Sequence, residues 1–346
     1  MTDTTNIGTV QKGRIQLFDN VKLFLIILVV LGHAADYYTS QYKEARWFFL
    51  YVYSFHMPAF IFVSGFFSKK LLTNKPFPTE KVFSLLILYV LLQLSIYGLL
   101  WFNGGSPKLS LFVVGGVPWF LLALPIWMVL LHILMPVKFS FLFPATIVAG
   151  VLVGFDPKVS QFLATSRVIV FFPFFLLGAY FRIEHVEMLR KRWVSVLSVV
   201  FIAAGIVLSW VYIDELYKLR YIFTGQNPYS VTVFSKSVLW SIGARVFNYI
   251  TAFLFIVALL AVVTNKSHSF TRLGERTLQV YFLHRLVLYE YFHLKINDHL
   301  KVLAPDYWWA LYIIIFIIVS FALSASVISK PFDYIYGLKY KIIMKQ

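Results

Sequence analysis

The sequence predicts an all-α polytopic membrane protein with about ten transmembrane helices in one bundle around a central polar cavity. Hydrophobic residues make up 60% of the 346 residues, whereas only 13% are charged. Soluble domains carry about 25% charged residues, so this composition excludes the water-soluble class. The mean hydropathy of +0.78 agrees with that conclusion.

Apolar windows along the chain place the predicted spans, because a helix needs roughly 20 apolar residues to cross a bilayer. Ten spans account for about 200 residues, which leaves little for a soluble domain. We therefore expect one membrane domain over residues 17–338, a cytoplasmic N-terminal segment over 1–16 and a short basic cytoplasmic tail over 339–346. The spans are expected near 18–38, 47–67, 82–102, 117–135, 139–155, 167–182, 194–213, 238–264, 278–294 and 308–329.

The distribution of Lys and Arg orients this bundle. If the N-terminus is cytoplasmic, 18 cations fall on the inner side and ten on the outer side. An excess of Lys and Arg in short cytoplasmic loops is the positive-inside rule, so both termini are expected in the cytoplasm of a multi-pass plasma-membrane protein. The net charge of +16 is explained in this way, and no nucleic-acid partner is expected.

The first span carries a stripe of polar groups. Lys22 and His33 are eleven residues apart, which is about 20° from full helical turns and roughly 16 Å along the axis. Asp19 lies three residues before Lys22, and Asp36 lies three residues after His33, within reach of the imidazole. Ionisable groups inside a membrane usually face a bundle interior or a wet cavity. The alternative is that Lys22 snorkels to the interface and His33 lies shallowly at the outer one.

Later spans add further polar groups. The second span contains His56, the sixth opens at Arg167, and the ninth contains His284 and Arg285. Three histidines and two arginines on spans are too polar for lipid exposure. Residues 115–127, "GGVPWFLLALPIW", contain prolines that either border a cavity or only kink a packed helix.

Several chemistries are excluded by the residues themselves. The chain has no cysteine, so thiolate nucleophiles and disulfides are absent. No histidine pair has the spacing of HExxH, so we expect no metal, and GxSxG and GxGxxG patterns are also missing. A phosphorylated cofactor would have to rely on scattered cations, for which we take Lys22, Lys69, Lys70 and Arg182. The positive-inside rule explains the loop cations among these without a cofactor.

Five segments in order carry a family resemblance: "FDNVKLFLIILVVLGH", "FHMPAFIFVSGFFSKK", "PWFLLAL", "FFPFFLLGAYF" and "VYFLHRLVLYEYF". Together they resemble the acyltransferase-3 family of membrane O-acyltransferases, and most closely its fucose 4-O-acetylase-like branch. The resemblance implies about ten spans and transfer of an acetyl group from acetyl-CoA to a glycan hydroxyl. The family signature is an arginine followed by ten residues and a histidine. Here Lys22 takes the arginine position, which keeps the charge and loses the bidentate fork.

The chemistry of acetyl transfer assigns roles as a hypothesis. A base must remove the hydroxyl proton and donors must stabilise an oxyanion. We predict His33 as general base or transient acyl carrier, oriented by Asp36, with Lys22 held by Asp19 to contact the cofactor. The catalytic set is therefore His33, Asp36, Lys22 and Asp19. The candidates for oxyanion and substrate contacts are His56, Trp119, Arg167, His284 and Arg285.

The partners expected are acetyl-CoA, which is not bound permanently, a glycan or lipid-linked saccharide acceptor, and the bilayer. Residues 214–236, "DELYKLRYIFTGQNPYSVTVFSK", are either an interfacial amphipathic segment or a lid over the acceptor site. A transporter of a glycan or lipid-linked sugar, with the intramembrane His, Lys and Asp as a relay, is the alternative function.

Overall fold

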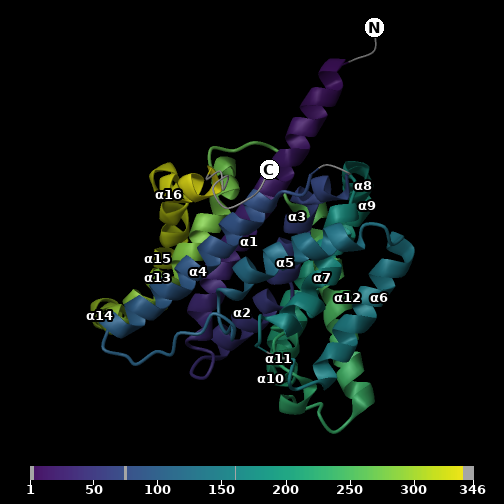
Figure 1. Ribbon diagram of the computed structural model, residues 1–346. Helices are drawn as coiled ribbons and strands as arrows, with labels where there is room; N and C mark the ends of the chain where they lie inside the picture. Colours follow the sequence, from purple (N-terminus) through teal and green to yellow (C-terminus); the bar gives the residue numbers. More distant parts are fainter. Residues whose placement is uncertain (1–3, 74–75, 160, 338–346) are drawn as a thin grey trace.

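The computed structural model describes residues 4–73, 76–159 and 161–337, and this part of the chain is almost entirely helical (Figure 1). It contains sixteen α-helices and no strand apart from one isolated bridge between Val113 and Phe162. The first half of the chain forms α1 (Thr4–Asp36), α2 (Lys43–Tyr53), α3 (His56–Phe67), α4 (Thr79–Phe102), α5 (Trp119–Leu134), α6 (Phe139–Leu152) and α7 (Thr165–Tyr180). The second half forms α8 (Ile183–Leu189), α9 (Arg192–Val211), α10 (Ile213–Leu216), α11 (Arg220–Phe223), α12 (Val238–Val262), α13 (Thr277–His293), α14 (Ile296–Leu303), α15 (Trp308–Leu323) and α16 (Ser326–Gly337).

The architecture confirms an all-α polytopic membrane protein, but the count of ten spans is not confirmed. Within the described ranges, five helical segments are long and apolar enough to cross a bilayer. They are Gln16–Asp36, Lys43–Phe67, Thr79–Phe102, Arg192–Val211 and Val238–Val262. Two bent pairs, α7 with α8 (98°) and α15 with α16 (51°), raise the number to seven if each is one span. Helices α5 and α6 have 16 and 14 residues, fewer than the roughly 20 that a straight span needs.

At the N-terminal end, the first candidate span is Gln16–Asp36, close to the expected 18–38, and helix α1 extends before it. Helix α1 begins at Thr4, well before the expected start of the first span near residue 18, and its first turns project beyond the other helices (Figure 1). The expected basic tail at 339–346 lies outside the described residues.

Helix α1 lies inside the bundle rather than against lipid. Leu17, Phe18, Leu25 and Ile26 are fully buried, because α1 packs against α2, α3, α13 and α15. The side-chain amide of Asn20 links the middle of α1 to the loop after α12, because it donates to the carbonyl oxygens of residues 264 and 266 at 2.8 and 3.0 Å. A helix fixed in this way presents its polar residues to its neighbours.

The close crossing of α3 and α7 sets the positions of His56 and Arg167, which lie in the first turns of these two helices. A Cβ atom on Gly65 would lie 2.0 Å from the carbonyl oxygen of Phe175, and one on Gly178 would lie 1.9 Å from that of Phe62. Such small residues let membrane helices approach closely. The crossing fixes the register of the two helices, and with it the positions of their first turns.

Candidate active site

A cavity of about 390 Å³ lies where α1, α2, α3, α7 and α13 meet, and the α10–α11 segment borders it. It brings together residues that are far apart in the sequence. Six residues expected from the sequence line it: His33, Asp36, His56, Trp119, Arg167 and Arg285. A polar cavity inside an apolar bundle is the usual setting for intramembrane chemistry.

His33 is the central group of this cavity. Its Nδ1 atom lies 3.1 Å from the hydroxyl oxygen of Tyr53, and its ring stacks on that of His284 at a centroid distance of 5.4 Å. The expected orienting partner, Asp36, lines the cavity but makes no hydrogen bond to His33 in the described part of the chain. Tyr53, one helix away, takes that place because Asp36 is the last residue of α1 and is exposed.

The other two histidines have fixed tautomers. Nδ1 of His56 lies 2.7 Å from the carbonyl oxygen of Val52, and Nδ1 of His284 lies 3.0 Å from that of Val280. A carbonyl oxygen only accepts, so each Nδ1 carries a proton and each Nε2 of the neutral ring holds a lone pair. Nε2 of His284 is buried with no hydrogen-bond partner among the described residues. His284 thus supports His33 through ring stacking and does not itself line the cavity.

Arg167 is a buried cation without a carboxylate partner in the described ranges. Its guanidinium donates to the carbonyl oxygens of Thr224 and Gly116 at 3.3 and 3.4 Å, and also to the side chain of Gln226. It lies over the ring of Trp119 at 5.0 Å. These neutral contacts hold the guanidinium in place while leaving its charge uncompensated.

Several cavity residues were not expected from the sequence. Tyr53 and Tyr281 line the cavity, and the Tyr281 hydroxyl donates to the carbonyl oxygen of Val117. The ring of Tyr53 meets that of His56 at a centroid distance of 4.8 Å across the break between α2 and α3, a contact that the sequence alone does not show. The segment 214–236 contributes more, namely Tyr217, Arg220, Tyr221, Phe223, Thr224, Gln226 and Asn227. Of the two alternatives for this segment, its contribution to the cavity lining favours a segment that covers the site over a purely interfacial one.

The cations expected to hold a cofactor lie elsewhere. Lys22 binds Asp19 at 2.8 Å and lies over the ring of Phe67 at 4.7 Å, and neither charged residue lines the cavity. Lys69 and Lys70 are exposed in a short 3₁₀ turn (Lys69–Leu72) after α3. Arg182 is likewise exposed at the start of α8. The polar stripe of α1 is therefore interrupted: only its C-terminal half, with His33 and Asp36, reaches the cavity.

The described residues contain no group of three His, Cys, Asp or Glu side chains placed to hold a metal ion. The cavity instead offers an imidazole, guanidinium groups and tyrosine hydroxyls. These are the groups that proton transfer and stabilisation of developing negative charge require.

Comparison with known families matches residues 15–327 to an acyltransferase domain. The chain therefore belongs to the acyltransferase-3 family. It is also 40% identical over 63 residues to nodulation protein NolL of Mesorhizobium japonicum, a match that covers 17% of this chain and 17% of that protein. No solved structure matches the chain. The fucose 4-O-acetylase-like branch of the family stays a prediction.

Proposed function

We propose that the protein is an integral membrane O-acetyltransferase that moves an acetyl group from cytosolic acetyl-CoA to a hydroxyl of a cell-surface or lipid-linked glycan. One observation carries the proposal: in a chain of this family, the imidazole of His33 lies at an inner cavity, with Nδ1 engaged by Tyr53. The resemblance to the fucose 4-O-acetylase-like branch supports acetyl as the acyl group and a sugar as the acceptor. The charge distribution supports a plasma-membrane location with both termini cytoplasmic.

In the proposed reaction, His33 acts as the general base. In this reaction Nδ1–H of His33 donates to the hydroxyl oxygen of Tyr53, so the lone pair is on Nε2, which accepts the proton of the acceptor hydroxyl. The hydroxyl oxygen attacks the thioester carbonyl carbon, the carbon–sulfur bond breaks, and the departing thiolate takes the proton from the imidazolium. The other route is transient acylation of the same nitrogen. In a second step the acetyl group is then transferred from this nitrogen to the acceptor hydroxyl rather than to water.

Arg167 is the proposed donor to the oxyanion of the tetrahedral intermediate. It is buried, carries a full positive charge and is fixed by three neutral acceptors. A preorganised donor of this kind contributes about 2.7–4 kcal/mol to transition-state stabilisation in other acyl-transfer enzymes. Arg285 lines the same cavity and is available for the acceptor.

Donor binding is proposed at the inner end of α1. Lys22 lies eleven residues before His33, about 16 Å along the helix axis, toward the side on which cytosolic acetyl-CoA is available. A pantetheine arm extended between the two residues would place the thioester near His33 and the phosphates near Lys22.

The proposal is tested with the full-length protein in lipid nanodiscs and radiolabelled acetyl-CoA. Release of CoA with transfer of label to a saccharide supports acetyl transfer, whereas a transporter would consume no acetyl-CoA. His33→Ala should abolish transfer without loss of membrane insertion. His132→Ala is the matched control, since His132 lies outside the cavity and packs against the ring of Phe77 at 4.9 Å. Full activity of His33→Ala would refute the assignment.

A further inference from the structure

The cavity has more positive charge than its own residues compensate. Arg167, Arg220 and Arg285 line it, and Asp36 is its single lining carboxylate among the described residues. None of the three arginines forms an ion pair within the described ranges. With neutral histidines, the lining carries a net charge of +2, and the carboxylate of Asp36 offsets part of the charge of Arg285.

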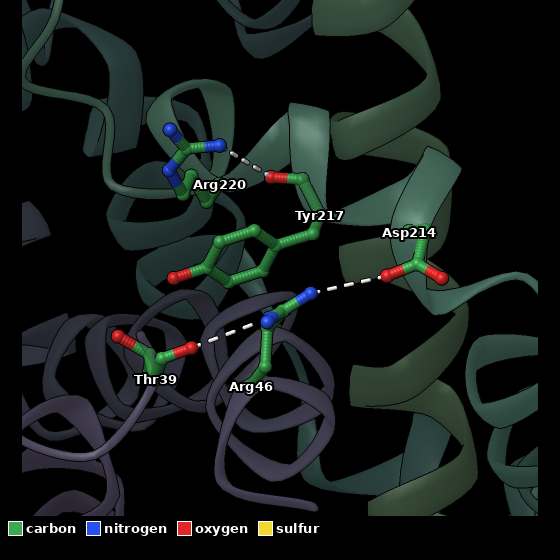
Figure 2. A network of polar contacts seen from close by, with 5 residues as sticks. All are labelled: Thr39, Arg46, Asp214, Tyr217 and Arg220. Atoms are coloured by element: carbon green, nitrogen blue, oxygen red, sulfur yellow. Dashed lines mark hydrogen bonds and ion pairs between the residues drawn. The ribbon is translucent and has the colours of Figure 1, made fainter. Parts of the chain in front are cut away.

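Arg220 differs from its neighbour Arg46, which does form an ion pair. Both guanidinium groups lie against the ring of Tyr217, at 4.7 and 5.5 Å from its centroid (Figure 2). Arg46 donates to the carboxylate of Asp214 at 3.1 Å and to the carbonyl oxygen of Thr39 at 3.2 Å. Arg46 is thus paired with a carboxylate and does not line the cavity.

Arg220 is instead held by neutral groups. It donates to the carbonyl oxygen of Tyr217 at 3.1 Å and to the hydroxyl oxygen of Tyr221 at 3.2 Å, and it lies 4.2 Å from the centroid of the Tyr221 ring. Two tyrosines therefore fix the position of the guanidinium, while its remaining N–H groups have no acceptor in the described part of the chain.

Arg285 is the second such group. It donates to the hydroxyl oxygen of Tyr289 at 3.2 Å and lies 4.5 Å from the centroid of that ring. Its other donors make no hydrogen bond to the described residues, and it is only partly buried. Arg220 and Arg285 come from segments 65 residues apart in sequence, and both reach the cavity that contains His33.

We propose that Arg220 and Arg285 form a subsite for a negatively charged group, a carboxylate or a phosphate, on the saccharide acceptor. The partly exposed ring of Tyr221 beside it packs on the sugar. Guanidinium groups are suited to this task because their fork of donors matches both carboxylate and phosphate. The inference rests on the proposed function and names the class of acceptor: an acidic saccharide rather than a neutral one.

The position of the subsite favours the acceptor over the phosphates of CoA. Arg220 belongs to the segment 214–236, which the charge distribution assigns to the outer side, and His33 is near the outer end of α1. Acetyl-CoA arrives from the cytosol, and the inner cations Lys22, Lys69 and Lys70 lie outside the cavity. The thioester has to reach His33 from that inner side, so the arginines at the outer side face the acceptor.

The test measures binding to the full-length protein in nanodiscs, without acetyl transfer. Four probes are compared: trigalacturonic acid, its carboxyl-reduced neutral trimer, a glycerol phosphate trimer and free CoA. Wild-type protein should bind one or both anionic saccharide-type probes at least tenfold more tightly than the neutral trimer. Arg220→Gln and Arg285→Gln should each remove about tenfold to a hundredfold of that preference, as expected for a charge-assisted hydrogen bond. Lys218→Gln is the matched control, because Lys218 is in the same segment, exposed and paired with Glu215.

The outcomes distinguish a carboxylate from a phosphate as the charged group on the acceptor. Preference for the uronate trimer assigns a carboxylate, and preference for the glycerol phosphate trimer assigns a phosphate. Equal affinity for charged and neutral trimers overturns the proposal. So does a loss of CoA affinity in the arginine variants with unchanged trimer binding, because the arginines then serve the donor. A protein that prefers the anionic probes but releases no CoA from acetyl-CoA keeps this subsite and refutes only the acetyl transfer.

Discussion

The hydroxyl oxygen of Tyr53 lies 3.1 Å from Nδ1 of His33, and the two rings meet edge to face at a centroid distance of 6.0 Å. Tyr53 is in turn stacked on Phe49 at 3.9 Å, so its own position is fixed by packing within α2. In the proposed reaction this contact holds the imidazole by Nδ1, as a carboxylate does in many catalytic histidines, and leaves Nε2 for the acceptor proton.

Tyr53→Phe should lower kcat for acetyl transfer by about fivefold, because one orienting hydrogen bond is worth roughly 1 kcal/mol. KM for both substrates should change little, since the ring and its packing stay. Steady-state kinetics in nanodiscs measure the effect. Tyr51→Phe is the control: its hydroxyl donates to the carbonyl oxygen of Ile202 at 3.2 Å, away from the cavity. Equal kcat for the two variants would show that Tyr53 has no orienting role.

Gly65→Ala should destabilise the protein by about 1–3 kcal/mol, because the added Cβ would lie 2.0 Å from the carbonyl oxygen of Phe175 and α3 must move away from α7. Thermal unfolding in detergent measures the loss. Gly98→Ala is the control, since a Cβ at Gly98 in α4 has no atom within 4 Å. That variant should be neutral or slightly more stable. A Gly65→Ala protein with unchanged stability would mean that the helices do not cross this closely.

The fold was predictable from the sequence to the extent that composition decides it. Apolar windows indicate the segments that form membrane helices. For example, α12 begins at Val238, which is the start of the span predicted there. The breaks were harder. The chain leaves α-helix between Tyr53 and His56 and bends by 98° between α7 and α8, and the first of these breaks lies within an apolar window predicted as one span. Such breaks depend on packing between helices, which hydropathy does not contain.

The site was predictable where a charge interrupts an apolar run. His33, His56 and Arg167 were found in this way, and the structure brings them to one cavity. Tyr53 and Tyr281 were missed because aromatic residues make up 19% of the chain, so one more tyrosine carries no signal. The loop lysines carry little signal for a different reason: the positive-inside rule supplies them whether or not a cofactor binds, so their role in cofactor binding stays a prediction.

Asp214→Asn should loosen the α10–α11 segment without unfolding the protein. The Arg46–Asp214 pair joins this segment to α2 at 3.1 Å, but the side chain of Asp214 is 76% exposed, so the pair contributes at most about 1 kcal/mol. Backbone hydrogen exchange over 213–223, followed by mass spectrometry, should be several times faster. Glu215→Gln is the control because Glu215 pairs with Lys218 inside the segment. Equal exchange in both variants would contradict the tether.

Lys22→Gln tests whether the Asp19–Lys22 ion pair has a structural role or a role in donor binding. Asp19 and Lys22 are 2.8 Å apart with side chains 7% and 17% exposed, so removal of the cation leaves a buried carboxylate unpaired. That typically costs about 3–5 kcal/mol, and the double variant Asp19→Asn/Lys22→Gln should recover most of the loss because both charges are gone.

If Lys22 also contacts CoA, the double variant will fold normally and still show an increase in KM for acetyl-CoA of about tenfold, as for a lost charge-assisted hydrogen bond. Thermal unfolding and acetyl-CoA titration of the two variants, measured side by side, give both quantities. A double variant with wild-type stability and wild-type KM would make the pair purely structural. The phosphates of the donor would then have to be held by cations other than the lysine of the first span.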